Sequence, residues 1–570
     1  MKKLVLTTLN SQYVHTSLAL RTLKENCDVE NLEILLREYT INEHLYDILE
    51  NLYMQHGDFY AFSCYIWNIR QTLEIIHCLK QVCPQCMIIL GGPEVSYNPQ
   101  EYLRESTADI IVMGEGEKTF TEVLQKLINH ESLDAVAGIT YRKHDQIIQN
   151  VPRNTLSQLD EISFPYPIDA FSQMSNQILY YETSRGCPYG CSYCLSSVDN
   201  HVRFLSLERV KKELSVFLDN KVQQVKFVDR TFNCDKKRAA EIFAYIIKHN
   251  NAFTNFHFEI AADLMDRDII TLLQQAPPGL IQLEIGVQTT HLPTLKAIHR
   301  WNAIEKIKKN VALLLEKQNI HLHLDLIAGL PFENLTTFKH SFNEVYLMHP
   351  HMLQLGFLKL LKGSPIEQEK ACYDYTFSPA PPFEVFSNRF ITYDEIIFLK
   401  KLAYLVDKYY NTGSYRHTLS YVIQNYYQEP FAFFEDMEEY WRQHSLFNSS
   451  YSKNKMYEIL YRFLQVFEDN KIGEKLKYDY LMYNKWPVPS FLKPNELSKE
   501  ETFHLLKDPS FVKKAIPQYE GLSPKAIYKL IHIEVFGNLL IDGDDSHESI
   551  ILFYKPIGSA INRVKDYVVI

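Results

Sequence analysis

The chain has 570 residues, 46% of them hydrophobic and 22% charged, and a net charge of −10. These values are typical of a globular protein with room for about three domains, and the negative charge argues against a protein that coats nucleic acid. No stretch approaches the ~20 apolar residues of a membrane helix, the apolar run after Lys3 is too short for a signal peptide, and ten cysteines are too few for a disulfide scaffold. We therefore expect a cytoplasmic protein.

The first 150 residues alternate apolar runs with helical segments. This pattern predicts an open, parallel α/β sheet of the Rossmann type, which binds ligands at the carboxyl ends of its strands. The expected strands are 3–7, 31–36, 58–63, 87–90 and 109–113. Two of them run into loops where glycines let the backbone approach a ligand closely. These loops are Gly91-Gly92-Pro93 and Gly114-Glu115-Gly116-Glu117.

A cysteine pair in the same region, Cys83 and Cys86, has the spacing of half a zinc site. No second pair lies nearby, and four ligands within ten residues of a turn are geometrically awkward. We expect ordinary turn and core thiols here, with zinc as the alternative.

A linker at residues 151–175 precedes a second series of strands and helices at 176–370. Repeated βα units of this spacing predict a partial TIM-type (β/α)6 barrel, whose active site lies at the carboxyl ends of the strands. The expected strands are 178–184, 224–229, 256–261, 280–287, 321–327 and 352–360. Asp229, Gln288 and Gly329 are at or near the ends of three of them. Glu284 lies within the fourth strand and could pair with Arg185 or Arg300.

The loop after the first barrel strand contains Cys187, Cys191 and Cys194 in the spacing C-x3-C-x2-C. Three thiolates can hold three irons of a [4Fe–4S] cluster and leave the fourth iron open to another ligand. A mononuclear zinc ion would require a fourth Cys or His nearby, and none follows closely.

The last 200 residues, 371–570, form a third region that is helical and rich in aromatic residues. Strand candidates at 531–536 and 550–554 indicate that the end of this region contains both helices and strands. The aromatic side chains could line a substrate cavity, but such a stripe is more often the core of a helical domain.

The cysteine loop, with Arg185-Gly186 before it, Pro188 after the first cysteine and Tyr193 before the last, resembles that of the radical S-adenosylmethionine (SAM) enzymes. The resemblance implies that SAM chelates the open iron. It further implies that Asp229, Gln288 and Gly329 contact SAM, although the family's Gly-Gly-Glu segment is absent here.

The glycine loops ahead of that motif resemble the cobalamin (B12)-binding domain of one branch of these enzymes. The resemblance implies cobalamin contacts at Gly91, Gly92, Pro93, Gly114, Glu115, Gly116 and Glu117. The motif D-x-H-x-x-G is absent, so cobalamin should bind without a histidine below the cobalt. The alternative is a degenerate Rossmann-like domain that binds nothing. The final region resembles the extra C-terminal domain of a subset of this branch.

These resemblances imply a cobalamin-dependent radical SAM enzyme that methylates an unactivated carbon through a 5′-deoxyadenosyl radical and methylcobalamin. Such an enzyme needs an external electron donor of the flavodoxin or ferredoxin type, and its substrate is a small molecule or a peptide. The alternatives are an oxidative cyclase or another non-methylating radical enzyme, a tRNA methylthiotransferase, and a non-catalytic cobalamin or redox sensor. The methylthiotransferase would need a second set of three cysteines and a basic RNA-binding module, and neither is evident.

Overall fold

The computed structural model describes all residues except 485, 538–548 and 555–565. These residues form two compact units, which are Met1–Ser341 with Leu355–Ile396 and Phe342–Gln354 with Ile397–Ile570. Within the described part of the chain, no helix is long and apolar enough to cross a membrane. The domain boundaries expected from the sequence stay predictions.

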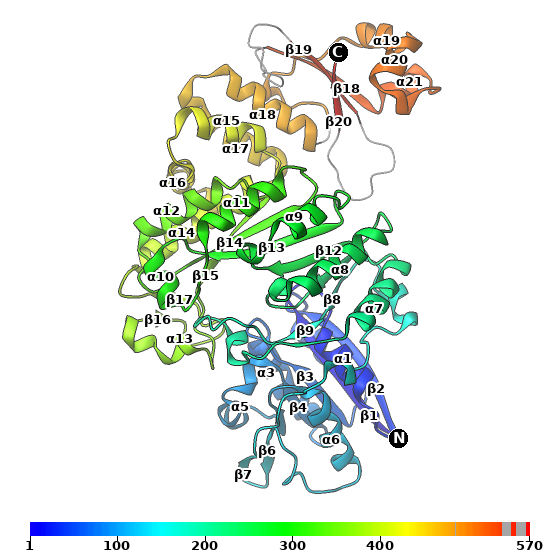
Figure 1. Ribbon diagram of the computed structural model, residues 1–570, viewed down its shortest axis with the longest axis vertical. Helices are drawn as coiled ribbons and strands as arrows, with labels where there is room; N and C mark the ends of the chain where they lie inside the picture. The colour runs from blue at the N-terminus through cyan, green and yellow to red at the C-terminus, as the bar shows by residue number, and fades with distance from the viewer. Residues whose placement is uncertain (485, 538–548, 555–565) are drawn as a thin grey trace. The chain divides into compact units, whose positions relative to one another are not determined.

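The N-terminal sheet has seven strands in the order β2-β1-β3-β4-β5-β6-β7 (Figure 1). The first five strands in this order are parallel, and the last two are antiparallel. Their bounds are β1 Lys2–Asn10, β2 Leu32–Thr40, β3 Phe59–Ser63, β4 Met87–Gly91, β5 Ile110–Val112, β6 Ile139–Lys143 and β7 Gln146–Gln149. The sequence therefore predicted the parallel strands, but not the antiparallel pair at the edge.

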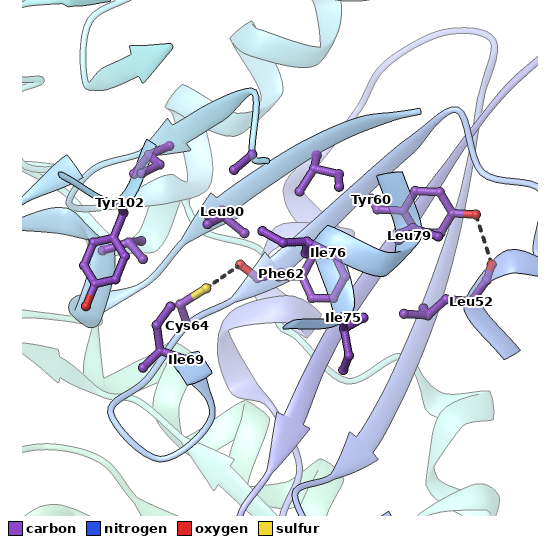
Figure 2. Packing of buried hydrophobic residues seen from close by; sticks show 14 of the residues in the cluster. Leu52, Tyr60, Phe62, Cys64, Ile69, Ile75, Ile76, Leu79, Leu90 and Tyr102 are labelled. Carbon is purple, nitrogen blue, oxygen red and sulfur yellow. Dashed lines mark hydrogen bonds between the residues drawn. The ribbon is translucent and has the colours of Figure 1, made fainter. Parts of the chain in front are cut away.

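Helices cover both faces of this sheet, because its strands are apolar on both sides. Tyr60 and Phe62 of β3 belong to one core cluster with α3, whereas Phe59 and Ala61 belong to another with α6. Figure 2 shows the first cluster, in which side chains of α3 pack over β3 and β4. The helices are α1 Leu18–Asn26, α2 Leu45–Tyr53, α3 Ile69–Val82, α4 Pro93–Ser96, α5 Pro99–Glu105 and α6 Gly116–Ile128.

The cysteine pair at the end of α3 belongs to this core. Cys86 is buried, and Cys83 packs against the same cluster. Neither residue is part of a group of three candidate metal ligands among the residues that the structure describes. Both thiols thus contribute to this core, and the expectation that they bind no zinc stays a prediction.

The second sheet of this unit has six strands in the order β15-β14-β13-β12-β11-β8. All the strand pairs from β8 to β14 are parallel. The strands are β8 Ile178–Tyr181, β11 Gln224–Phe227, β12 Asn255–Ile260, β13 Ile281–Gln288, β14 His321–Ala328 and β15 Met352–Phe357. The accompanying helices are α7 Leu207–Asp219, α8 Lys236–Lys248, α9 Arg267–Leu273, α10 Leu292–Ala297, α11 Ile304–Leu315, α12 Leu335–Tyr346 and α13 Pro365–Gln368. This is the partial barrel expected from the sequence.

The two faces of this sheet differ in polarity. In β13 and β14, apolar side chains are buried and alternate with half-buried polar ones. The apolar face packs on helices, as Phe258 of β12 does on Phe243 of α8. The opposite face carries Lys226, His257 and Glu284, so the interior of the barrel is polar.

The C-terminal unit is largely helical, with a small antiparallel sheet near its end. Its helices are α14 Tyr393–Leu405, α15 Arg416–Tyr426, α16 Pro430–Gln443, α17 Lys453–Leu464, α18 Asn470–Tyr483, α19 Lys499–Leu506, α20 Pro509–Ala515 and α21 Pro524–Tyr528. The strands are β18 Ile531–Phe536, β19 Ser549–Tyr554 and β20 Asp566–Val569. Trp441, Tyr409 and Tyr457 are fully buried. These aromatic side chains form the helical core, as the sequence favoured.

Candidate functional site

The cysteine loop is held at the carboxyl end of β8 by a short antiparallel ladder. Ser184–Arg185 (β9) pairs with Arg203–Phe204 (β10), and the N–H of Cys187 donates to the carbonyl of Asp199. Gly186 has φ +92°, and a Cβ there would lie 2.4 Å from the carbonyl oxygen of His201. Only glycine therefore fits at the entry to the loop.

The three cysteine side chains differ in burial but belong to one loop. Cys187 and Cys191 are buried, and Cys194 is half-buried. Among the described residues, the three sulfurs are not one of the groups whose ligand atoms all lie within 4.8 Å of one another. Three thiolates on one loop are the number that leaves one iron of a [4Fe–4S] cluster without a protein ligand.

Arg300 places a positive charge beside this loop. Its Nη1 donates to the Sγ of Cys191 at 3.6 Å and to the hydroxyl of Tyr193 at 3.2 Å. Its Nη2 donates to the carbonyl of Gly286. The sequence suggested Arg300 or Arg185 as a partner for Glu284, but Glu284 contacts Lys226 and His257 instead. That interpretation was wrong, because the three partners sit on neighbouring strands of one sheet face.

Arg185 joins the cysteine loop to the second glycine loop of the N-terminal sheet. It forms ion pairs with Glu182, Glu117 and Glu115. Arg203 reinforces the junction with a 2.8 Å ion pair to Glu115. Burial raises the pKa of Glu115, but the contacts with Arg203 and its neighbours outweigh it and lower the pKa overall. These contacts give Glu115 and Glu117 a connecting role, and their contact with cobalamin stays a prediction.

The other residues of the glycine loops lie at the carboxyl edge of the same sheet. Gly91 ends β4, and Pro93 begins α4. Gly92 has φ +108°, and a Cβ there would lie 2.5 Å from the carbonyl oxygen of Cys64, so this glycine is required by the fold. Gly114 has φ +71° with nothing within 4 Å of a Cβ, whereas Gly116 begins α6. At Gly114, therefore, the space that a Cβ would enter is open.

Exposed aromatic side chains lie near this edge. Tyr13 follows β1 and is 73% exposed, and Trp67 follows β3 and is 46% exposed. Trp67 stacks on Tyr65 with ring centroids 4.3 Å apart. Exposed aromatic groups at the ligand-binding edge of an open α/β sheet are suited to cover a large organic cofactor.

The three predicted SAM contacts have different surroundings. Asp229 is buried and accepts hydrogen bonds from the N–H and hydroxyl of Thr183 and the hydroxyl of Ser184. Gln288 has φ +70° at a register shift in β13, and its buried Oε1 has no hydrogen-bond partner. Gly329 has φ +91° beyond β14. Of the three, Gln288 is the residue that lacks a partner, whereas Asp229 holds the start of the cysteine loop.

The polar face of the barrel carries a cluster of interacting ionisable side chains that the sequence analysis did not identify. Burial would raise the pKa of Glu284, but His257 and Lys226 outweigh it and lower that pKa to about 2. Burial, helped by Glu284, raises the pKa of Asp325 to about 8. The sequence feature that could have revealed this polar face is the alternation of polar and apolar residues in 281–288 and 321–328.

Family models match three consecutive parts of the chain. A B12 binding domain matches residues 4–124, and the radical SAM superfamily matches residues 181–345. A family described as protein of unknown function (DUF4080) matches residues 371–553.

Curated relatives are distant and mostly methyltransferases. A 2-(S-pantetheinyl)-carbapenam-3-carboxylate methyltransferase of Streptantibioticus cattleyicolor is 26% identical over 350 residues, 57% of this chain and 50% of the relative. The uncharacterized methyltransferase PH0819 of Pyrococcus horikoshii is 28% identical over 227 residues, 38% of this chain and 49% of the relative. An anaerobic magnesium-protoporphyrin IX monomethyl ester cyclase of Synechocystis is 28% identical over 245 residues, 41% of this chain and 48% of the relative. The chain thus spans about half the length of the curated relatives it matches.

Solved structures share the fold. The cobalamin-dependent SAM radical enzyme OxsB, with aqua-cobalamin bound, has a TM-score of 0.59 at 16% identity, covering 84% of this chain and 80% of OxsB. The radical SAM methyltransferase TsrM of Kitasatospora setae, with cobalamin and a [4Fe–4S] cluster, has a TM-score of 0.56 at 14% identity, covering 67% of this chain and 78% of TsrM.

Proposed function

Because this chain belongs to the B12-binding radical SAM enzymes with a C-terminal domain of unknown function, we propose that it methylates an unactivated carbon of its substrate. The cofactors are a [4Fe–4S] cluster, SAM and cobalamin. When bound, they supply hydrogen-atom abstraction and a methyl group, while the protein orients the reactants. An external one-electron donor of the flavodoxin or ferredoxin type supplies the reducing equivalents, and the substrate is a small molecule or a peptide.

The residues present fit these cofactors. Cys187, Cys191 and Cys194 provide three thiolates on one loop, which is the set that leaves one iron open. The unpartnered Oε1 of Gln288 is a buried acceptor that needs a donor, and a SAM hydroxyl or amino group would satisfy it. Gly114, with open space at its Cα, would lie against cobalamin.

Charged side chains of this chain prepare the site for that chemistry. Arg300 donates to the Cys191 sulfur and stabilises negative charge there. Arg185 and Arg203 hold the cysteine loop against Glu115 and Glu117. Partly buried ion pairs of this kind fix the geometry of the junction.

One observation carries the proposal. Arg185, two residues before Cys187, binds Glu117 of the second glycine loop, so the expected cluster loop and the expected cobalamin loop are in direct contact. If the N-terminal domain no longer bound a cofactor, there would be no functional reason for its ligand-binding edge to contact the expected cluster loop. Methyl transfer is favoured over oxidative cyclisation by the number of methyltransferases among the relatives.

The test is a product analysis under anaerobic conditions with a chemical one-electron reductant. The reconstituted protein is incubated with SAM carrying a deuterated methyl group, first alone and then with a metabolite extract. We expect 5′-deoxyadenosine, S-adenosylhomocysteine and a deuteromethylated product that requires cobalamin. Release of 5′-deoxyadenosine with no methylated product would favour an oxidative cyclase. If the protein does not cleave SAM at all, a non-catalytic cobalamin or redox sensor would be the remaining alternative.

A further inference from the structure

A second group of ligating side chains lies on the polar face of the barrel, apart from the cysteine loop. His257, Glu284 and His323 each offer one ligand atom, and these three atoms all lie within 4.8 Å of one another. They come from β12, β13 and β14, which are adjacent in the sheet. Two imidazoles and a carboxylate are the ligand set of many catalytic zinc sites.

The sheet register explains why the three side chains meet. Glu284 is directly opposite His323, and His257 is opposite Gln282, two residues before Glu284. Side chains two apart in a strand point to the same face, and neighbouring strands lie about 4.8 Å apart. The three residues therefore project from rigid strands into one small volume, without any loop.

The distances fit two ligands of one ion. Nε2 of His257 lies 2.9 Å from Oε2 of Glu284. Ligand atoms about 2.0–2.1 Å from a tetrahedral zinc ion are separated by roughly this distance or slightly more. His257 is only 6% exposed, and the polar partner of its Nε2 is the Glu284 carboxylate that would share the ion.

The neighbouring side chains complete the site. Nε2 of His323 lies 2.8 Å from the amide nitrogen of Gln282, and this contact holds the imidazole ring in place on the polar face. Nζ of Lys226 lies 3.0 Å from Oε2 of Glu284. Its side chain is 26% exposed, so it can neutralise Glu284 when no ion is bound and withdraw when one is.

We propose that His257, Glu284 and His323 bind one divalent ion of the zinc type. Three protein ligands leave the fourth position open, as in catalytic rather than structural zinc sites. That position takes water, or an oxygen or nitrogen donor of the substrate, on the inner face of the barrel. The inference rests on this geometry alone and does not depend on methyl transfer.

The test measures zinc in the full-length protein with its iron–sulfur cluster reconstituted, so that the cluster cysteines are occupied. We expect about one zinc per chain after desalting, with a zinc X-ray absorption spectrum that shows only nitrogen and oxygen ligands near 2.0–2.1 Å. Sulfur ligands near 2.3 Å would place the zinc on cysteines and overturn the proposal, as would protein that retains none.

Variants separate metal binding from a structural role. H257Q and H323Q should weaken zinc binding at least about tenfold, whereas H321Q, on the same face of β14, should not. K226M should strengthen zinc binding, because it removes the cation that competes for Glu284. If this polar cluster were only an ion-pair network, K226M would lower the melting temperature and leave zinc retention unchanged. That result would contradict the proposal.

Discussion

The guanidinium of Arg300 donates from Nη1 to the Sγ of Cys191 at 3.6 Å. Arg300 comes from the segment after the fourth barrel strand, 109 residues beyond Cys191 in the chain. The same guanidinium donates to the carbonyl of Gly286, which fixes its position. A predicted cluster ligand thus has a permanent positive charge beside it.

Replacing Arg300 with Gln should lower the reduction potential of the cluster. A reduced cluster carries one more negative charge, so a hydrogen-bonded cation stabilises the reduced form. A differential contribution of about 1 kcal/mol corresponds to roughly 40 mV for one electron. The measurement is an anaerobic redox titration followed by electron paramagnetic resonance.

The matched control is Arg230→Gln, since Arg230 is an exposed arginine at the carboxyl edge of the same sheet. Its removal should shift the potential much less. Equal shifts in both variants would show that only the overall charge matters, and not the contact with Cys191.

Changing Cys187, Cys191 or Cys194 to Ala should abolish cluster retention. A cluster held by only two thiolates dissociates readily, because each thiolate coordinates one iron and a second iron would then lack a protein ligand. Iron and sulfide content after reconstitution provides the measurement. Cys372→Ala is the control, because Cys372 is exposed and lies outside the loop. A fully loaded C194A protein would exclude Cys194 as a ligand.

Gly186→Ala should disrupt the cysteine loop without touching a cysteine. The added Cβ would lie 2.4 Å from the carbonyl oxygen of His201, at a φ of +92° that alanine rarely adopts. We expect a destabilisation of about 2 kcal/mol or more and reduced iron content. Gly473→Ala is the control, because a Cβ there meets only Tyr461, at 3.7 Å. Normal iron content in G186A would mean that the ladder to β10 does not hold the loop.

The pair of Arg185 and Glu117 should be strongly coupled. Their side chains are only 15% and 10% exposed. Removal of one partner from a buried pair costs about 3–5 kcal/mol, because the remaining charge is left unpaired. A double-mutant cycle with R185M and E117Q, followed by denaturant unfolding, measures the coupling. The double variant should lose less stability than the sum of the single variants, and strict additivity would argue against the contact.

Stability should fall as pH rises toward 8, because of Glu333. Burial raises its pKa from 4.5 to about 8, despite opposing hydrogen bonds from Thr289 and Ser341. Between these values the folded protein binds a proton that the unfolded chain releases, so the free energy of unfolding decreases with pH by about 3–5 kcal/mol. Unfolding measured from pH 5 to 9 should show a shallower slope in E333Q. E305Q, at an 87% exposed site, is the control and should keep the slope of the unchanged protein.

The sequence predicted the strands that carry the site because they are strongly patterned. Continuous apolar runs such as 87–90 can be recognised from local composition alone. The antiparallel strands β6 and β7, of which β7 is the edge strand, were missed, because Arg142 and Lys143 make β6 look like a polar loop. Edge strands are commonly polar, since one side faces solvent.

The cysteine loop can be predicted from a sequence motif, whereas contacts that only three-dimensional packing makes were missed. The three cysteines are close in sequence, so their spacing defines them. Arg300 contacts Cys191, 109 residues away, and Arg185 contacts Glu117, 68 residues away. The group of His257, Glu284 and His323 depends on strand register, which local patterns do not specify.

The central claim is that one chain binds both an iron–sulfur cluster and cobalamin. Its most direct test is the absorption spectrum of anaerobically reconstituted protein that has been supplied with iron, sulfide and hydroxocobalamin and then desalted. The account predicts one [4Fe–4S] cluster and one retained cobalamin with a base-off spectrum. A protein that keeps the cluster but no cobalamin would contradict it and leave a radical SAM enzyme on an N-terminal domain without a cofactor.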